Sequence, residues 1–172
     1  MRVQWRWTIP SALIAGAVCS APLVAQNGAG SGVDVCTLAT DEEFQRAQGL
    51  HPQLGVLPGD APVLTEMVWG PHCDYGAGSI DLFMHKSPAA ELERVLKLTE
   101  GGKQRSPVQG LGQRAFFTTI YPDDKYRNRG LIAIYLGPRI LTLSLDARDD
   151  ETTESTKPKL EQLAKLVLPR YK

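Results

Sequence analysis

Histidine, serine and carboxylate side chains can together form a hydrolytic site, and this chain carries three histidines, His51, His72 and His85. A serine hydrolase needs a histidine base beside a serine nucleophile and an acid that orients the histidine. The Gly-x-Ser-x-Gly elbow that exposes such a serine in many hydrolases does not occur in the sequence. Paired acids such as Glu42 and Glu43 fall where a helix cap is predicted. A small secreted serine-type hydrolase is therefore the alternative function and not the leading one.

Cysteine and histidine side chains can also bind metal ions, and the candidate ligands here are Cys73 with His72, His51 and His85, where Cys73 directly follows His72. Adjacent residues of a strand point to opposite faces, so these two side chains would not converge easily on one ion. If Cys19 leaves with an export signal, Cys36 and Cys73 are the two cysteines that remain. An even pair in an oxidising compartment favours a disulfide. We therefore predict a Cys36–Cys73 disulfide and no metal site.

The N-terminal residues have the composition of an export signal. Arg2 and Arg6 give a basic start, residues 9–18 are mainly apolar, and Ala25 is a small residue at the expected cleavage point. An uncleaved membrane anchor is disfavoured, because the apolar run is short and interrupted by small residues and proline. A lipid-modified Cys19 is disfavoured by the residues before it. We expect an exported protein, periplasmic or extracellular, with no membrane span in the mature chain.

Three segments follow from this interpretation. Residues 1–25 are the predicted signal peptide, residues 26–32 a glycine-rich flexible lead, and residues 33–172 a single secreted domain. Loss of the signal would leave 17 basic and 19 acidic residues, a net charge of −2. A protein that binds the phosphate backbone usually carries a basic surface. The composition therefore predicts that the chain does not bind nucleic acid.

A glycine-rich stretch, Gly110 to Ala115, is the nearest approach to a phosphate-binding loop. A dinucleotide-binding loop would be followed by a helix and would have a third glycine where Ala115 stands, whereas the residues after this stretch have the pattern of a strand. The stretch is more typical of a turn. We expect no cofactor.

Three amphipathic helices are predicted from their end signals. The first begins at the Thr40–Glu43 capping box and ends at Gly49, and the second begins at Ser87-Pro88. The third begins at Pro158, with leucine and valine at helical spacing. Segments with the composition of strands lie between the helices: Val63 to Trp69, His72 to Tyr75, Ser79 to His85, Arg114 to Tyr121, Leu131 to Leu136 and Arg139 to Asp146.

Strands grouped between separate helices are typical of an α+β fold. We predict an antiparallel sheet of about five or six strands, with three helices packed mainly on one face. Aromatic residues on the strands are expected to fill the core and the sheet faces. If one face is uncovered, Phe83, Phe117 and Tyr135 are the candidates to line a ligand groove.

Short motifs along the chain resemble a known group of proteins. They are the stretch from Cys36 to Glu43, the sequence Cys73-Asp-Tyr75, the stretch from Val108 to Ala115, and the paired strands from Leu131 to Leu145. In this pattern the chain is similar to small exported bacterial domains of unknown function, as in actinobacterial lipoproteins and the extracellular sensor domains of mycobacterial serine/threonine kinases. The resemblance implies a disulfide-pinned α+β fold that binds or senses.

The leading functional prediction is an exported, non-enzymatic binding or interaction domain whose partner is a protein or a small molecule not identified by the sequence. It rests on the absence of a catalytic motif and on the aromatic residues of the predicted strands. This hypothesis and the hydrolase alternative differ in one respect, because the hydrolase requires a serine and one of the histidines to meet in the folded chain.

Overall fold

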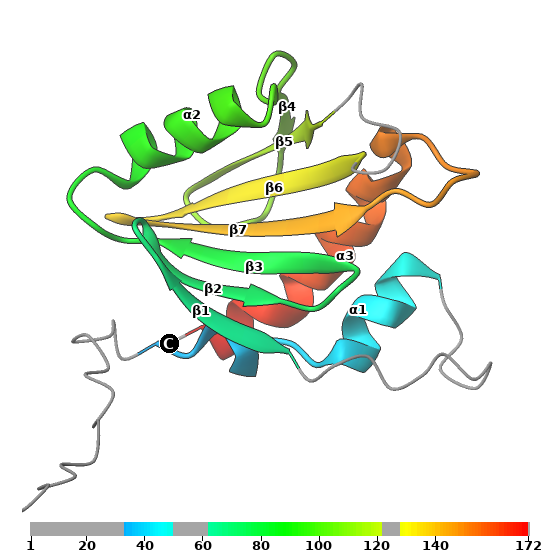
Figure 1. Cartoon of the computed structure of the whole chain (residues 1–172), viewed down its shortest axis with the longest axis horizontal. Helices are drawn as coiled ribbons and strands as arrows, with labels where there is room; N and C mark the ends of the chain where they lie inside the picture. The colour runs from blue at the N-terminus through cyan, green and yellow to red at the C-terminus, as the bar shows by residue number, and fades with distance from the viewer. Residues whose placement is uncertain (1–32, 50–61, 122–127, 172) are drawn as a thin grey trace, which may run out of the picture.

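The computed structural model describes residues 33–49, 62–121 and 128–171, and the predicted signal and flexible lead lie outside them. In the described residues, seven strands form one open, fully antiparallel sheet in the order β1-β2-β3-β7-β6-β5-β4. Three α-helices pack against this sheet (Figure 1). The prediction of an antiparallel α+β fold is confirmed.

The strands and helices have the following bounds. The strands are β1 (Val63–Met67), β2 (Gly70–Asp74), β3 (Gly78–Phe83), β4 (Ser106–Val108), β5 (Arg114–Ile120), β6 (Arg129–Leu136) and β7 (Arg139–Asp146). The α-helices are α1 (Asp41–Gln48), α2 (Pro88–Leu98) and α3 (Thr156–Val167). Short 3-10 turns lie at Val35–Thr37, Thr153–Ser155 and Leu168–Arg170.

The sheet has one strand more than the upper end of the predicted range. The additional strand is β4, which has three residues and contains Pro107. Proline cannot donate to a ladder and is tolerated in edge strands, and β4 is the edge strand next to β5. A strand so short, with proline at its centre, has no alternating pattern by which it could be recognised.

Two of the three helices share one face of the sheet. Helices α1 and α3 pack on the larger apolar cluster, to which the strands contribute residues such as Ile80, Ile134 and Leu143. Helix α2 packs on the opposite face, where Leu92 and Leu96 are fully buried. The two faces are therefore both covered in part, and Figure 1 shows α2 on the far side of β5 and β6 from α3.

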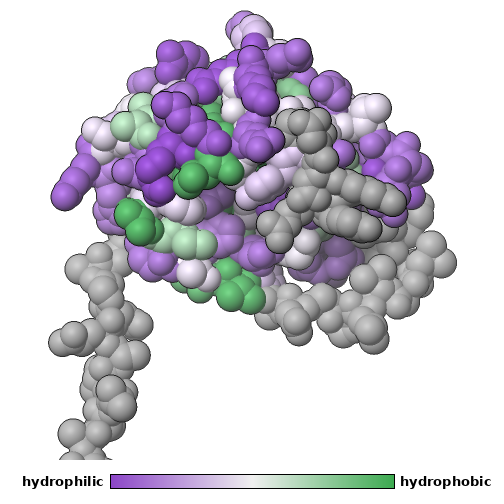
Figure 2. Space-filling model, turned by 45° about the horizontal axis from the view of Figure 1, so that its top comes forward, coloured by the Kyte–Doolittle hydropathy of each residue, from purple (hydrophilic) through white to green (hydrophobic). Residues whose placement is uncertain are grey.

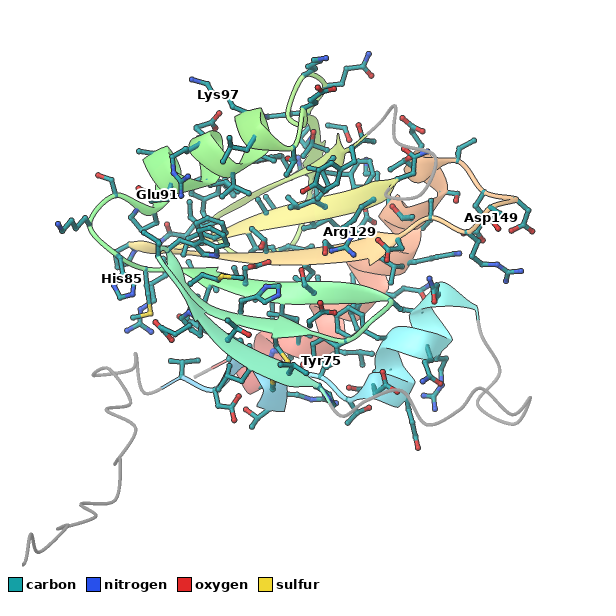
Figure 3. The ribbon with its side chains drawn as sticks, viewed as in Figure 1. Tyr75, His85, Glu91, Lys97, Arg129 and Asp149 are labelled. Carbon is teal, nitrogen blue, oxygen red and sulfur yellow. A yellow bond between two sulfur atoms is a disulfide. The ribbon has the colours of Figure 1, made fainter. Side chains whose placement is uncertain are left out.

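The disulfide joins Cys36, in the 3-10 turn before α1, to Cys73 in β2, with 5.3 Å between their Cα atoms. Beside it, the ring of Tyr75 stacks on Phe44 of α1 at a centroid distance of 4.1 Å. The Tyr75 hydroxyl donates to the carbonyl oxygen of Cys36 at 3.2 Å, and Figure 3 shows Tyr75 near α1. Burial raises the pKa of this hydroxyl. The disulfide and the ring pair together hold the N-terminal segment of the domain against β2.

Candidate functional site

The three aromatic residues proposed as groove candidates do not share one surface. Phe83 and Tyr135 lie on the face that packs against α2, whereas Phe117 belongs to the cluster under α1 and α3. Phe83 is 2% exposed and stacks on Trp69. Phe117 borders one surface hollow, which includes Thr119 and Glu154, and Tyr135 borders a different one.

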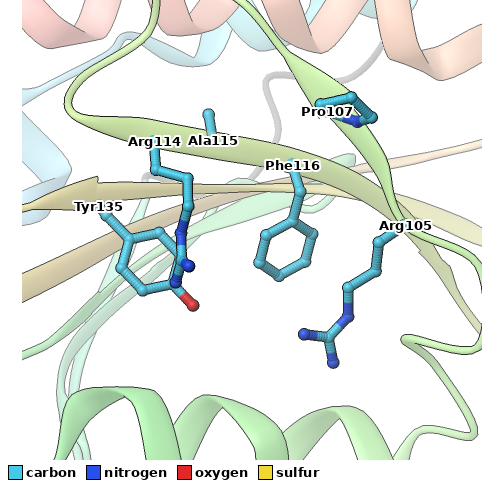
Figure 4. A pocket seen from close by; sticks show the side chains of 6 residues that line it. All are labelled: Arg105, Pro107, Arg114, Ala115, Phe116 and Tyr135. Carbon is cyan, nitrogen blue, oxygen red and sulfur yellow. The ribbon is translucent and has the colours of Figure 1, made fainter.

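That hollow has a volume of about 280 Å³ and lies on the α2 side of the sheet, at the β4–β5 edge (Figure 4). We call it the aromatic–arginine hollow and define it by its lining residues: Arg105, Pro107, Arg114, Ala115, Phe116 and Tyr135. No α2 residue is among them. The hollow therefore opens where α2 leaves the outer strands uncovered.

Strand register brings these side chains together. Arg114 and Phe116 are two residues apart in β5. Their side chains therefore point to the same face of the sheet. Tyr135 of β6 is paired with Arg114, and Pro107 of β4 is paired with Phe116. Figure 4 shows the arginine, phenylalanine and tyrosine side chains extending from the strands toward α2.

Each arginine of the hollow lies over an aromatic ring. The guanidinium carbon of Arg105 is 4.7 Å from the Phe116 ring centroid, and that of Arg114 is 4.0 Å from the Tyr135 centroid. Guanidinium groups within about 6 Å of a ring face are held by cation–π attraction. The two rings are 6.3 Å apart and tilted by 46°. Both guanidinium groups thus rest on rings of the hollow.

The two arginines differ in their acidic partners. Arg105 forms a two-pronged ion pair with Glu93 of α2, with both N–O distances 2.7 Å. This pairing lowers the pKa of Glu93 and raises that of Arg105. Within residues 33–49, 62–121 and 128–171, no carboxylate pairs with Arg114. The hollow accordingly presents one unneutralised positive charge.

A second set of functional groups surrounds Asp81, at the part of the same face nearer β1. The Asp81 carboxylate accepts from His72 Nδ1 at 2.8 Å and from the Trp69 indole at 3.3 Å. It also accepts from the hydroxyls of Ser79 and Thr142, each at 3.2 Å. We call these five residues the Asp81 cluster. Four donors on one carboxylate leave it fully satisfied.

An ion pair between an arginine and an aspartate adjoins this cluster. Arg129 of β6 forms a bidentate ion pair with Asp146 of β7, and it lies over these two strands in Figure 3. Its guanidinium is also 3.5 Å from the hydroxyl of Ser144, which hydrogen-bonds to Ser79 at 2.9 Å. This face of the sheet therefore has two parts: an apolar part covered by α2, and a polar part that contains the Asp81 cluster and Arg129.

The Asp81 cluster contains the acid and the histidine of a hydrolytic triad, but it lacks the hydrogen bond from a serine to that histidine. His72 Nδ1 donates to Asp81, which leaves Nε2 as the position from which a base would act. Ser79 hydrogen-bonds to Asp81 and Ser144 and not to the imidazole. Among the described residues, no serine hydroxyl contacts His72. His85 lies on the surface near Glu66, and His51 lies outside the described residues.

Metal binding finds no support in the described part of the chain, where no group of three or more cysteine, histidine or acidic side chains is arranged to hold an ion. The metal alternative included Cys73, whose sulfur is in the disulfide with Cys36. None of the helices among the described residues combines the length and apolar character needed to cross a bilayer. On the face that Figure 2 shows, the coloured residues are mainly hydrophilic, with small separate apolar patches.

Comparison of the chain with models of protein families, with characterised proteins and with solved structures finds no match. The resemblance to exported bacterial domains therefore stays a prediction. The function has to be argued from the side chains themselves.

Two pairings at these sites were missed by the sequence-based reasoning. Neither the pairing of His72 with Asp81 nor that of Arg114 with Tyr135 is visible without the strand register. For the first, a signal was present: the tight turn between Asp74 and Gly78 sets β2 and β3 in register, which places His72 opposite Asp81. For the second, β5 and β6 are joined through residues 122–127, which lie outside the described residues, and their register could not be counted from a tight turn.

Proposed function

We propose that the protein is an exported, non-enzymatic binding domain that holds a ligand in the aromatic–arginine hollow. The observation that carries the proposal is the stacking of two guanidinium groups on two aromatic rings at an open surface hollow. Export is supported by the signal-like composition of residues 1–25 and by the disulfide, a bond typical of oxidising compartments.

The chemistry of the hollow suits recognition better than catalysis. Ligand sites combine apolar and aromatic walls with a few polar groups that fix orientation. Here Phe116, Tyr135 and Pro107 supply the apolar walls, and the two arginines supply the polar groups. Because the arginines are already held by the rings, binding costs little side-chain entropy. No histidine or serine of the described residues lines the hollow, so it lacks a nucleophile and a base.

A fragment screen followed by two-dimensional amide NMR tests this proposal. We expect at least one class of fragment to shift the amide signals of Arg114, Phe116 and Tyr135. The substitution Tyr135→Leu should abolish those shifts because it removes the ring on which Arg114 lies. The matched control is Tyr171→Leu, since Tyr171 packs on the opposite face. Fragments that leave the hollow's signals unmoved, or that bind Tyr135→Leu equally well, would contradict the proposal.

The hydrolase alternative is favoured by one contact, the 2.8 Å approach of His72 Nδ1 to Asp81. It would require a serine to move to Nε2, away from its present hydrogen bonds. A fluorophosphonate probe, which labels activated serines, distinguishes the two functions. We expect no labelling of the native protein. Labelling that disappears in both His72→Ala and Ser79→Ala would establish a hydrolase and replace the binding proposal.

A further inference from the structure

The charge of the aromatic–arginine hollow restricts what it can bind. Arg105 is neutralised by Glu93 at 2.7 Å, whereas Arg114 has no carboxylate partner among the described residues. A cationic ligand would be repelled by the remaining charge, and a neutral one would leave Arg114 unpaired. A dianion such as a phosphate monoester would need a second positively charged side chain that has no acidic partner. A single negative charge therefore matches the hollow.

The geometry of Arg114 favours a planar anion. Its guanidinium lies over the Tyr135 ring at 4.0 Å, which leaves the edge of the guanidinium for hydrogen bonding. A carboxylate can accept two parallel N–H bonds from such an edge. The ring also favours one orientation of the guanidinium plane.

The apolar walls and the size of the hollow define the rest of the ligand. Phe116 and Pro107, paired across β5 and β4, form an apolar wall beside Arg114. The volume of about 280 Å³ is near the lower limit of about 300 Å³ that is usual for drug-sized ligands. One ring with a short acidic side chain fills such a space, whereas a fused multi-ring system would extend out of it.

We infer that the hollow binds an aromatic monocarboxylate, with the carboxylate on Arg114 and the ring against Phe116 and Pro107. This inference rests on the proposed binding function and adds the chemical class of the ligand. The same chemistry is offered by a free aromatic acid and by the C-terminal aromatic residue of a peptide. The inference covers the shared group, and the experiment separates the two sources.

Four probes test the inference by NMR titration of the protein as purified after export. They are 3-phenylpropionate, its neutral amide, hexanoate, which has the charge without the ring, and an N-acetylated tripeptide ending in phenylalanine. We expect 3-phenylpropionate to shift the signals of the hollow, and both the amide and hexanoate to bind at least tenfold more weakly. Binding of the tripeptide would identify a chain end as a source, and failure of the tripeptide alone would identify the free acid.

Two substitutions test whether Arg114 is the residue that binds the carboxylate of 3-phenylpropionate. Arg114→Gln keeps most of the side-chain length and removes the charge, and we expect it to weaken 3-phenylpropionate binding at least tenfold. The matched control is Arg148→Gln, an exposed arginine paired with Asp150 and absent from the lining of the hollow, which should bind as the native protein does. Melting temperatures measured in parallel show that both variants are folded.

The outcomes separate the ligand class from the binding function. Equal binding of the acid and the amide, or an unchanged affinity in Arg114→Gln, overturns the monocarboxylate while the hollow remains a binding site. If these probes leave the hollow unmoved and other fragments bind there, the ligand class is wrong and the function stands. If no fragment of any class moves the signals of the hollow, the binding function itself fails.

Discussion

At the scale of single residues, the main finding is how one carboxylate organises a polar region within a sheet. A partly buried charge such as that of Asp81 is costly unless hydrogen bonds compensate it. Asp81 accepts from His72, Trp69, Ser79 and Thr142, so its lone pairs are used and four donors are satisfied at once. The contact also determines that His72 carries its proton on Nδ1 when neutral. Asp81 therefore controls both the position and the protonation of His72.

The pKa of His72 tests this control. The hydrogen bond to Asp81 raises it above 6.5, with Asp74 adding to the effect and both burial and Arg129 opposing it. We expect NMR titration of the imidazole to give a midpoint above 6.5, and Asp81→Asn to lower that midpoint. Because the folded-state pKa is the higher one, the stabilisation is complete below pH 6.5 and is lost as pH rises through the folded-state value. A native midpoint at or below 6.5 would contradict the assignment.

Glu43 has the opposite dependence on pH. Its ion pair with Arg170, at 2.7 Å, lowers its pKa from 4.5 to about 2. The pair therefore stabilises the fold above pH 4.5, and this contribution is lost as pH falls toward 2. Urea unfolding should show Arg170→Gln less stable than the native protein at pH 7, with the difference closing in acid. Glu42→Gln, on the same helical turn, is the control and should show a smaller effect at pH 7.

At the scale of elements, the sequence identified most helices and strands because their signals are local. The Thr40–Glu43 capping box and the left-handed Gly49 are both present at the ends of α1. The helix predicted to begin at Pro158 begins earlier, at Thr156. Strand β4 was missed, because it has three residues and a central proline.

The candidate site was less accessible to sequence reasoning than the fold. Helical periodicity shows that α2 has an apolar side, but it does not say which face of the sheet that side covers. The hollow exists because α2 packs opposite α3 and leaves the β4–β5 edge open. Its members come from β4, β5, β6 and the residue just before β4, and their meeting depends on strand register. Of the predicted groove residues, Tyr135 alone lines the hollow.

Two leucines of α2 provide a matched test of its packing. Leu96 is 1% exposed and packs on the sheet, whereas Leu98, two residues later, is 70% exposed. We expect Leu96→Ala to lower the free energy of unfolding by about 2–5 kcal/mol through lost burial and a cavity. Leu98→Ala should change it by less than about 0.5 kcal/mol. Equal effects in urea denaturation would show that α2 does not dock as described.

Across the molecule, the disulfide and the aromatic–arginine hollow lie on opposite faces of the sheet. The disulfide joins β2 to the segment before α1, on the α1 and α3 face, while the aromatic–arginine hollow lies on the α2 face. The sheet lies between the two. Substitution of the two cysteines therefore changes no residue that lines the hollow.

The disulfide itself should be measurable as stability. Closing a loop between residues 37 apart contributes about 3–4 kcal/mol in the loop-entropy model. We expect Cys36→Ala with Cys73→Ala to lower the free energy of unfolding by roughly this amount, and reductant to have no further effect on that double variant. Mass spectrometry of unreduced peptides should recover the two cysteines in one linked fragment. Recovery of the two as separate free thiols would refute the bond.

The position of β7 has a consequence for when this molecule can fold. The strands made first, β1 to β3, and those made next, β4 to β6, form two groups that meet only through β7, the last strand in the sequence. During synthesis, each group must wait with an open edge until residues 139–146 have emerged. The open edges keep the sheet from closing, which suits the export that we propose for this chain. Late arrival of the central strand thus delays closure of the sheet until β7 has been made.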